Sequence, residues 1–365
     1  MNILHLSSES SWRGGEQQIA YLIEELDKMG IKPIVACKPD SRFEALCIDK
    51  GWEHYTLKMK NSTDVKSGIG LKKLCKNLSI DIVHAHSSHS HGTAYLSYLL
   101  GNKTPVVLTR RVDFELKNNF ISKHKYTFPK IKKIVCVSDA IKEIVLKTTK
   151  QREKCMTIYS AINHKKFEPY IGNDFLRKKY NIADEITLIG NTSAIAPHKD
   201  YYTFVDSAQY YVQNFDQKVK FFVIGKGELE KEIKDYVKNR KLEEYFIFTG
   251  FQKNIEEVLP SLDIFFISSK TEGLGTSVID AFASKVPVVA TKAGGIPELV
   301  RNLETGLTSN IKDFKNLAED LFQLKKDKKL QKQLIKNAYT YSLQFNTKSM
   351  AEKYLNLYQE IKSEK

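Results

Sequence analysis

The chain has 365 residues, of which 42% are hydrophobic and 27% are charged, the balance of a globular protein rather than a disordered or fibrous one. No stretch approaches the ~20 consecutive apolar residues that span a bilayer, and the opening MNILHLSSES lacks the basic region and apolar run of a secretory signal. Five scattered cysteines, never spaced as CxxC, indicate reduced thiols rather than disulfides or a zinc site. We therefore expect a cytoplasmic protein with two domains of about 150 to 200 residues each.

Positive charge is concentrated in the first half of the chain. The formal net charge is +14; residues 1–165 hold 27 Lys and Arg against 16 Asp and Glu, whereas residues 166–365 hold 30 against 27. This asymmetry indicates that the first half faces an anionic partner. Nucleic acid, an anionic membrane and a phosphorylated substrate all fit, and a Lys-rich solvated surface is the alternative without a partner.

Short apolar runs alternate with helical patterns along the first half. The first run, Asn2–Leu6, is followed by a glycine loop and then by apolar residues at helical spacing. The next runs predicted as strands are Lys32–Cys37, Asp81–Ala85, Pro105–Thr109 and Ile134–Val137. Strands that alternate with helices imply a parallel sheet with helices on both faces.

The same pattern repeats in the second half, where the predicted strands are Ile186–Ile189, Val219–Ile224, Phe246–Thr249, Ile264–Ile267 and Val286–Ala290. We therefore predict an α/β protein with two Rossmann-like parallel-sheet domains, residues 1–163 and 164–343, facing each other across a cleft. A helix over residues 344–365 should follow. Its apolar stripe at helical spacing indicates a face packed on the protein's own core, and we expect the helix to pack back toward the first domain; the stripe consists of Met350, Tyr354, Leu357, Tyr358 and Ile361.

The stretch Ser268–Val300 carries the most informative motif, directly after a predicted strand. An acid lies in a glycine turn, a helix then begins, and a second acid follows one helical turn later; these residues are Glu272, Gly275, Thr276, Ser277 and Asp280. A helix N-terminus bared by glycine presents free backbone N–H groups and a positive dipole end, which suits a pyrophosphate. The second acid is then placed to reach a ribose hydroxyl.

This stretch resembles the donor-binding region of glycosyltransferase family 4, whose members are retaining enzymes with the GT-B fold. The family signature is a Glu, seven residues and a second Glu; the first faces the transferred sugar and the second holds the ribose. Glu272 matches the first position. The second position is Asp280, which shortens the reach by one methylene but keeps the carboxylate.

The resemblance extends over nearly the whole chain. The loop at Gly14 and Gly15 resembles the family's glycine loop, which meets the donor phosphates and the reacting sugar, so the resemblance implies a catalytic contribution from Gly15. Two later loops, which contain Gly225 and Phe251, resemble the walls around the nucleotide base.

The segment at residues 196–200 resembles the family's phosphate-binding segment, and Lys199 matches its lysine. The Arg that the family usually carries five residues earlier is replaced by Ala194. Lys199 and helix N-terminal amides must then carry more of the diphosphate charge. No D-x-D pair follows a predicted strand, so we expect stabilisation of the leaving group by Lys199 rather than by a metal.

Four histidines lie within eight residues: His84, His86, His89 and His91. Their spacing matches no known zinc motif, and we expect that His84 and His86, on alternate positions of a strand, do not converge with the others. We therefore assign no metal. His86 or His89, on the loop after the strand, is a candidate to hydrogen-bond acceptor or donor hydroxyls; polar loop residues without a role are the alternative.

Two further basic features end the first half. Arg110 and Arg111 close a predicted strand where the family frequently has a His, and paired Arg suit a phosphate or carboxylate; an internal ion pair, for example with Asp113, is the alternative. The segment Lys117–Lys133 is basic with aromatic residues interleaved. It suits an anionic lipid interface or single-stranded nucleic acid, or its aromatics belong to the core.

Together these features predict a hexosyltransferase that takes a sugar from a nucleotide diphosphate carrier, UDP favoured over GDP, with no cofactor. The resemblance implies a saccharide or lipid-linked acceptor, bacterial cell-surface glycan synthesis of the polysaccharide or lipopolysaccharide type, and peripheral binding to the inner face of the membrane. A nucleotide-sugar epimerase of the same architecture and a non-catalytic nucleotide-sugar-binding protein are the alternatives. We expect no nucleic-acid partner, because no recognition motif accompanies the charge.

Overall fold

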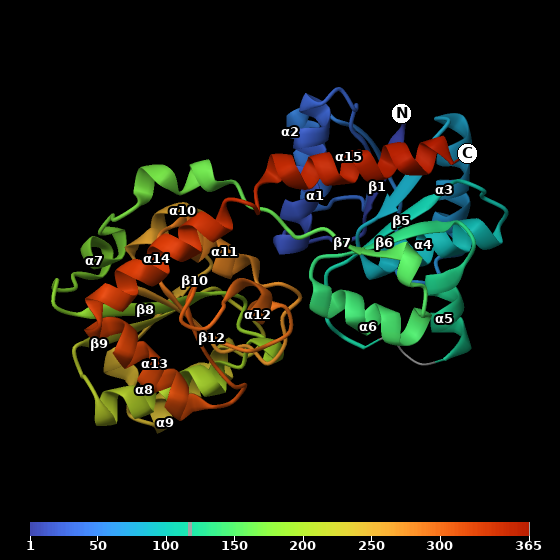
Figure 1. Cartoon of the computed structure of the whole chain (residues 1–365). Coiled ribbons are helices and arrows are strands. Elements are labelled where there is room, and N and C mark those ends of the chain that lie inside the picture. The colour runs from blue at the N-terminus through green and yellow to red at the C-terminus, as the bar shows by residue number, and fades with distance from the viewer. Residues whose placement is uncertain (116–118, 365) are drawn as a thin grey trace. The chain divides into compact units, whose positions relative to one another are not determined.

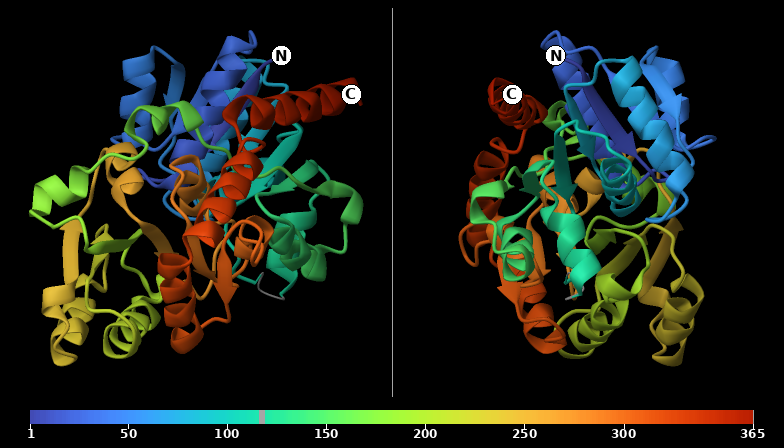
Figure 2. Two further views of the ribbon diagram at one scale, coloured as in Figure 1. Left: turned by 60° about the vertical axis from the view of Figure 1, so that its left-hand side comes forward. Right: turned by 90° about the vertical axis from the view of Figure 1, so that its right-hand side faces the viewer.

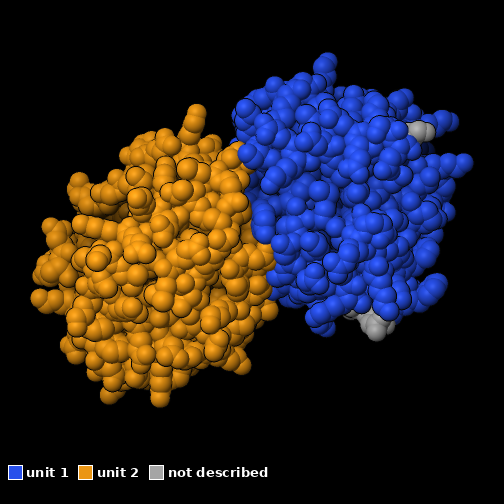
Figure 3. Space-filling view, viewed as in Figure 1, with its two compact units in different colours: residues 1–161, 347–365 blue, residues 162–346 orange. Residues whose placement is uncertain are grey.

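The computed structural model describes residues 1–115 and 119–364. The chain forms two compact units, coloured separately in Figure 3. Unit 1 consists of residues 1–161 and 347–365, and unit 2 of residues 162–346. The two units are described one at a time.

Unit 1 is built on a seven-stranded parallel sheet in the order β3-β2-β1-β4-β5-β6-β7 (Figure 1). Its strands are β1 (Ile3–Ser7), β2 (Ile34–Cys37), β3 (Glu53–Thr56), β4 (Ile82–Ala85), β5 (Val106–Arg110), β6 (Ile131–Cys136) and β7 (Cys155–Thr157). The helices are α1 (Gly14–Lys28), α2 (Arg42–Lys50), α3 (Val65–Asn77), α4 (Ser88–Leu99), α5 (Phe120–Thr127), α6 (Asp139–Thr149) and α15 (Thr347–Ser363).

The last helix, α15, belongs to unit 1 although it is last in the chain. It packs beside α1 (Figures 1 and 2). The predicted apolar stripe is buried in a core cluster with Ile3 of β1, Ile82 of β4 and Val107 of β5. Each fully buried large side chain contributes about 1.5–3 kcal/mol. This burial explains why the chain returns to its first unit, and it confirms the predicted packing of the C-terminal helix.

Unit 2 is built on a six-stranded parallel sheet in the order β10-β9-β8-β11-β12-β13. Its strands are β8 (Thr187–Thr192), β9 (Val219–Ile224), β10 (Phe246–Gly250), β11 (Ile264–Ile267), β12 (Val288–Thr291) and β13 (Leu307–Ser309). The helices are α7 (Phe175–Tyr180), α8 (Tyr201–Asn214), α9 (Glu230–Asn239), α10 (Ile255–Val258), α11 (Thr276–Ala283), α12 (Ile296–Leu299), α13 (Phe314–Lys326) and α14 (Lys328–Ser342).

Both sheets have a topological switch point, where the strand order reverses. In unit 1 it lies between β1 and β4, and in unit 2 between β8 and β11. The loops that leave the carboxyl ends of two such strands run in opposite directions, which opens a crevice that ligands use in doubly wound sheets. The sites described below lie at these two points.

All ten predicted strands are present, and the prediction of two Rossmann-like parallel-sheet units is confirmed. Three strands were not predicted: β3, β7 and β13. Each is the edge strand of its sheet and only three or four residues long. An edge strand is paired on one side only, so its sequence needs no continuous apolar run; β3, with the sequence EHYT, has no buried residue.

Candidate active site

The switch point of unit 2 brings Lys199 and Glu272 together. Lys199 ends a short 3-10 helix (Pro197–Lys199) in the loop after β8, and Glu272 lies in the loop after β11. The Lys199 Nζ and Glu272 Oε1 atoms form an ion pair at 2.5 Å, with the two side chains 15% and 9% exposed. The amide of Lys270 donates to the carbonyl of His198 at 2.8 Å and ties the two loops together. The predicted acid, Glu272, and the predicted cation, Lys199, are therefore in direct contact.

Glu272 is held in place from three directions. The Ser269 hydroxyl donates to its Oε1 at 2.7 Å, and the Gly295 amide donates to its carbonyl oxygen at 3.0 Å. Gly294 has a φ of +51°, and a Cβ atom on it would lie 2.0 Å from the same carbonyl oxygen. Only glycine fits at position 294, so Gly294 and Gly295, the second glycine turn of this stretch, pack directly against the backbone of Glu272.

The helix α11 begins beside this pair. Gly275, its N-cap residue, has a φ of +90°, and Thr276 and Ser277 are its first residues. The first N–H groups of a helix have no partner within it, so they are free to meet an anion. Asp280 lies one turn along and is half-buried. Burial raises its pKa to about 7, while Lys166 partly offsets the rise and Glu256 adds to it.

The loop after β9 closes against the loop after β8. A Cβ atom on Gly225 would lie 2.1 Å from the Ser193 carbonyl oxygen, and one on Gly227 would lie 2.2 Å from that of Ile195. These glycines allow the two backbones to approach and pair, since the amide of Ile195 donates to the carbonyl of Lys226 at 3.2 Å. The next loop, after β10, carries the exposed ring of Phe251.

The switch point of unit 1 gathers a second group. Gly14 and Gly15 are the first residues of α1, and the aliphatic stem of Arg111 lies against Gly15, 3.6 Å from the place a Cβ atom would occupy. Beneath them, three neighbouring strands present polar residues at alternate positions, which face the same side of the sheet. These residues are His5 and Ser7, His84 and His86, and Thr109 and Arg111.

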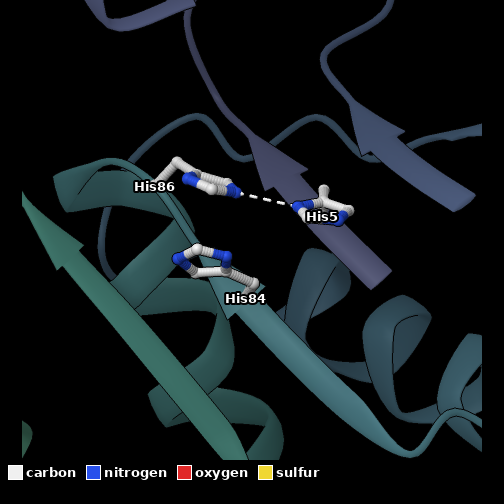
Figure 4. Close-up of side chains that lie close together, drawn as sticks. All are labelled: His5, His84 and His86. Carbon is white, nitrogen blue, oxygen red and sulfur yellow. Dashed lines mark hydrogen bonds between the residues drawn. The ribbon is translucent and has the colours of Figure 1, made fainter. Parts of the chain in front are cut away.

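Three of these residues form a buried histidine group, drawn in Figure 4. His5 Nδ1 lies 3.1 Å from His86 Nε2, and the rings of His84 and His86 have centroids 3.7 Å apart. The candidate ligand nitrogens of the three rings lie within 4.8 Å of one another. As expected, His84 and His86 do not converge with His89 or His91, but the expectation did not foresee that they meet a third histidine, His5. The missing partner was His5, because β1 pairs directly with β4 and sets His5 opposite His84.

Five of the six ring nitrogens of this group already have partners among the described residues, the exception being His5 Nε2. His84 Nδ1 lies 2.6 Å from the hydroxyl of Tyr358 on α15, and its Nε2 lies 2.7 Å from that of Thr109. Burial lowers the pKa of His5 to about 3 and that of His84 and His86 well below the usual value, so the rings are neutral. Neutral imidazole suits a metal, but binding one would break these hydrogen bonds. The nearby guanidinium of Arg111 would also oppose it.

The two adjacent arginines have different surroundings. Arg110 is buried, and its guanidinium donates to the Tyr126 hydroxyl at 2.8 Å and to the Phe114 carbonyl. Arg111 is half-buried and contacts His86 Nδ1 at 3.5 Å. The internal partners of Arg110 are therefore Tyr126 and Phe114 rather than an acid. His89 lies apart from both, in the first turn of α4.

The basic and aromatic segment divides into buried and exposed parts. Lys117 and Asn118, at its start, lie outside the described residues. Among the rest, Phe128 is fully buried, whereas Phe120 and its neighbour Ile121 are 82% and 71% exposed. Two of its lysines pair with acids of α15, Lys132 with Glu364 and Lys133 with Glu360. No helix among the described residues is long and apolar enough to cross a membrane.

The predicted residues thus fall into two groups, one in each unit. Unit 2 brings Lys199 and Glu272 into contact. Gly275, Thr276 and Ser277 begin α11, Asp280 lies one turn along it, and Gly225 and Phe251 lie in the loops after β9 and β10. Unit 1 brings together Gly14, Gly15, His86 and Arg111. The sequence reasoning did not find His5, Ser269 or the steric role of Gly294. The alternation of polar residues in H-x-S, H-x-H and T-x-R was the signal that would have found the first.

Comparison with known sequences gives the same assignment for both halves. Residues 12–166 match the family described as "Glycosyltransferase Family 4", and residues 172–341 match "Glycosyl transferases group 1". The chain belongs to the family 4 glycosyltransferases. The two matches together leave only the ends and a five-residue join uncovered. These matches favour a glycosyltransferase over the epimerase and the non-catalytic binding protein.

Curated relatives of this glycosyltransferase are enzymes. The N-acetyl-alpha-D-glucosaminyl L-malate synthase of Bacillus anthracis is 24% identical over 80% of this chain and 77% of its own. The UDP-Gal:alpha-D-GlcNAc-diphosphoundecaprenol alpha-1,3-galactosyltransferase of Escherichia coli is 26% identical over 73% of this chain and 72% of its own.

Solved structures show the same fold at low sequence identity. HepE of Anabaena, determined with UDP and glucose, has a TM-score of 0.83 at 17% identity and covers 99% of this chain and 100% of its own. The sucrose-phosphate synthase of Thermosynechococcus elongatus has a TM-score of 0.84 at 15% identity over the full length of both chains. These similarities confirm the predicted GT-B architecture.

Proposed function

We propose that this glycosyltransferase moves a hexose-type sugar, with retention of anomeric configuration, from a UDP-sugar to a saccharide or lipid-linked acceptor in cell-surface glycan synthesis. The observation that carries the proposal is the Lys199–Glu272 pair beside the glycine-bared N-terminus of α11. UDP is favoured over GDP because the Escherichia coli relative is named for a UDP-sugar and HepE was determined with UDP.

The leaving diphosphate needs positive charge at the moment the bond to the sugar breaks. In this site that charge comes from Lys199 and from the first amides of α11, which need no reorganisation during the reaction. Ala194 removes the second side-chain cation that the family usually provides. Lys199 therefore carries a larger share of the stabilisation.

Glu272 has two roles in this proposal. Its carboxylate orients Lys199 in the free protein, and it faces the transferred sugar when the donor is bound. Asp280 accepts hydrogen bonds from the ribose, and Gly225 and Phe251 border the base. The reacting sugar is contacted by the glycine loop at Gly14 and Gly15. The hydroxyls of the acceptor or donor are hydrogen-bonded by His86 and His89. None of these roles uses a metal ion.

Replacement of Lys199 tests the proposal. Removing one preorganised donor to a developing negative charge lowers kcat by about 10²–10³-fold, and we expect that loss in Lys199→Ala. Lys270→Ala is the matched control, because Lys270 lies in the neighbouring loop but pairs with Asp200 at 3.1 Å. Its turnover should stay within about threefold of the wild type, because Lys270 is itself 39% exposed and the buried Asp200 keeps a hydrogen bond from the Thr203 hydroxyl.

The assay is release of UDP from a panel of UDP-sugars with added acceptors, in the presence and absence of EDTA. Equal losses in Lys199→Ala and Lys270→Ala, or activity lost with EDTA and restored by a divalent ion, would contradict the proposal. Conversion of a UDP-sugar into its epimer without acceptor would support the epimerase instead. UDP binding without turnover of any donor would support the non-catalytic binding protein.

We further propose that the transferase docks on an anionic membrane surface through the exposed pair Phe120 and Ile121. Both side chains are exposed on the first turn of α5, which also carries the exposed Lys123. Apolar side chains beside lysines suit the boundary between acyl chains and anionic headgroups. Lys132 and Lys133 contribute less than their charge indicates, because acids of α15 pair with them.

A further inference from the structure

Arg111 has no counter-charge in contact with it among the described residues. Its guanidinium is half-buried, and its Nε atom is buried without a hydrogen-bond partner. The acid whose charge it feels most is Glu16, whose Oε2 instead accepts from the Arg13 amide at 3.0 Å. A charge removed from water is costly unless a partner compensates for it. The arrangement is therefore incomplete without an anion.

The histidine group next to Arg111 accepts only one of the hydrogen bonds that its guanidinium can donate. Because Arg only donates, the contact at 3.5 Å makes His86 Nδ1 the acceptor. The proton of His86 is then on Nε2, which donates to His5 Nδ1 at 3.1 Å. The neutral rings therefore offer Arg111 a single lone pair and no charge, which leaves further guanidinium hydrogens available to bind another group.

We propose that Arg111 binds an anionic group of the acceptor, a phosphate or a carboxylate, and so selects acidic acceptors over neutral ones. This inference rests on the proposed function, because it assigns the acceptor to the switch point of unit 1. The position supports it: Arg111 follows β5 and lies against Gly15, at the edge of the sheet where ligands of doubly wound folds bind. A planar guanidinium matches both anions through paired hydrogen bonds.

The experiment is titration calorimetry on the full chain saturated with UDP. The probes are N-acetylglucosamine 1-phosphate against N-acetylglucosamine, and glucuronate against glucose, so that phosphate and carboxylate are tested separately. We expect the acidic member of at least one pair to bind about tenfold more tightly, the effect of one charge-assisted hydrogen bond. Arg111→Gln should abolish that difference, and Arg111→Lys should keep part of it.

Arg110→Gln is the matched control, because it removes one positive charge from the adjacent residue. The Nε of Arg110 also lacks a partner in the described part of the chain, but its two terminal nitrogens donate to Tyr126 and Phe114. Arg110→Gln should keep the preference for the acidic probe. Equal affinity for acidic and neutral probes, or a preference that survives Arg111→Gln, would overturn the inference. So would a weaker affinity for UDP alone in Arg111→Gln, because the guanidinium would then serve the donor. Failure of the wild type to bind UDP would contradict the proposed function instead.

Discussion

Gly294 offers a sharp test of how the site is held, because its role is steric rather than chemical. A Cβ atom on it would lie 2.0 Å from the Glu272 carbonyl oxygen, so either the turn or Glu272 must move in Gly294→Ala. The positive φ costs a non-glycine residue about 1–2 kcal/mol, and overpacking against backbone adds about 1–3 kcal/mol. Unit 2 should therefore lose about 2–5 kcal/mol of its free energy of unfolding. Donor binding should weaken with it.

Gly172→Ala separates the cost of the positive φ from the cost of the steric clash. Gly172 also has a positive φ, +77°, but a Cβ atom there would meet nothing within 4 Å. It should therefore cost only the conformational term of about 1–2 kcal/mol.

The assay is urea unfolding of the full chain followed by far-UV circular dichroism. Both tryptophans, Trp12 and Trp52, belong to unit 1, so their fluorescence reports that unit separately. Equal destabilisation by Gly172→Ala and Gly294→Ala would refute the steric account of the second glycine turn.

Three further outcomes follow from the structure. Tyr358→Phe removes the hydroxyl bonded to His84 Nδ1, so unit 1 should lose about 1–3 kcal/mol in urea unfolding; unchanged stability would place that hydroxyl outside the network. Burial raises the pKa of Asp280 from 3.8 to about 7, so between these values the folded chain holds a proton that the unfolded chain releases. The free energy of unfolding should therefore fall as pH rises from about 4 through 7. An identical fall in Asp280→Asn would contradict this. Replacing Phe120 and Ile121 by Ser should abolish co-sedimentation with anionic vesicles at low salt; unaltered sedimentation would exclude them as the anchor.

Much of the fold could be predicted from the sequence because its signals are local. Central strands of a parallel sheet are buried on both faces, so they appear as continuous apolar runs such as Ile264–Ile267. Edge strands need no such run, and all three of the strands that were missed are edges. The stripe of α15 indicated a buried face, and its partner followed only from the family resemblance.

The candidate site was predictable where its residues are close in the sequence. The donor motif from Glu272 to Asp280 is one continuous turn and helix, so its spacing carries the information. The histidine group was not predictable in this way, because His5 and His84 meet only through the pairing of β1 with β4. The contrast between Arg110 and Arg111 was equally hidden, since it depends on which side of the sheet each residue faces.

The most direct test of the central claim is transfer by Glu272→Gln compared with the wild type. Full-length chain, labelled UDP-hexoses and an acceptor that the wild type uses are followed by nuclear magnetic resonance, which reports both the rate and the anomeric configuration. We predict a wild-type product with the configuration of the donor, and less than about a tenth of the wild-type rate in the folded variant. A product of inverted configuration, or a variant that keeps more than that rate, would contradict the account.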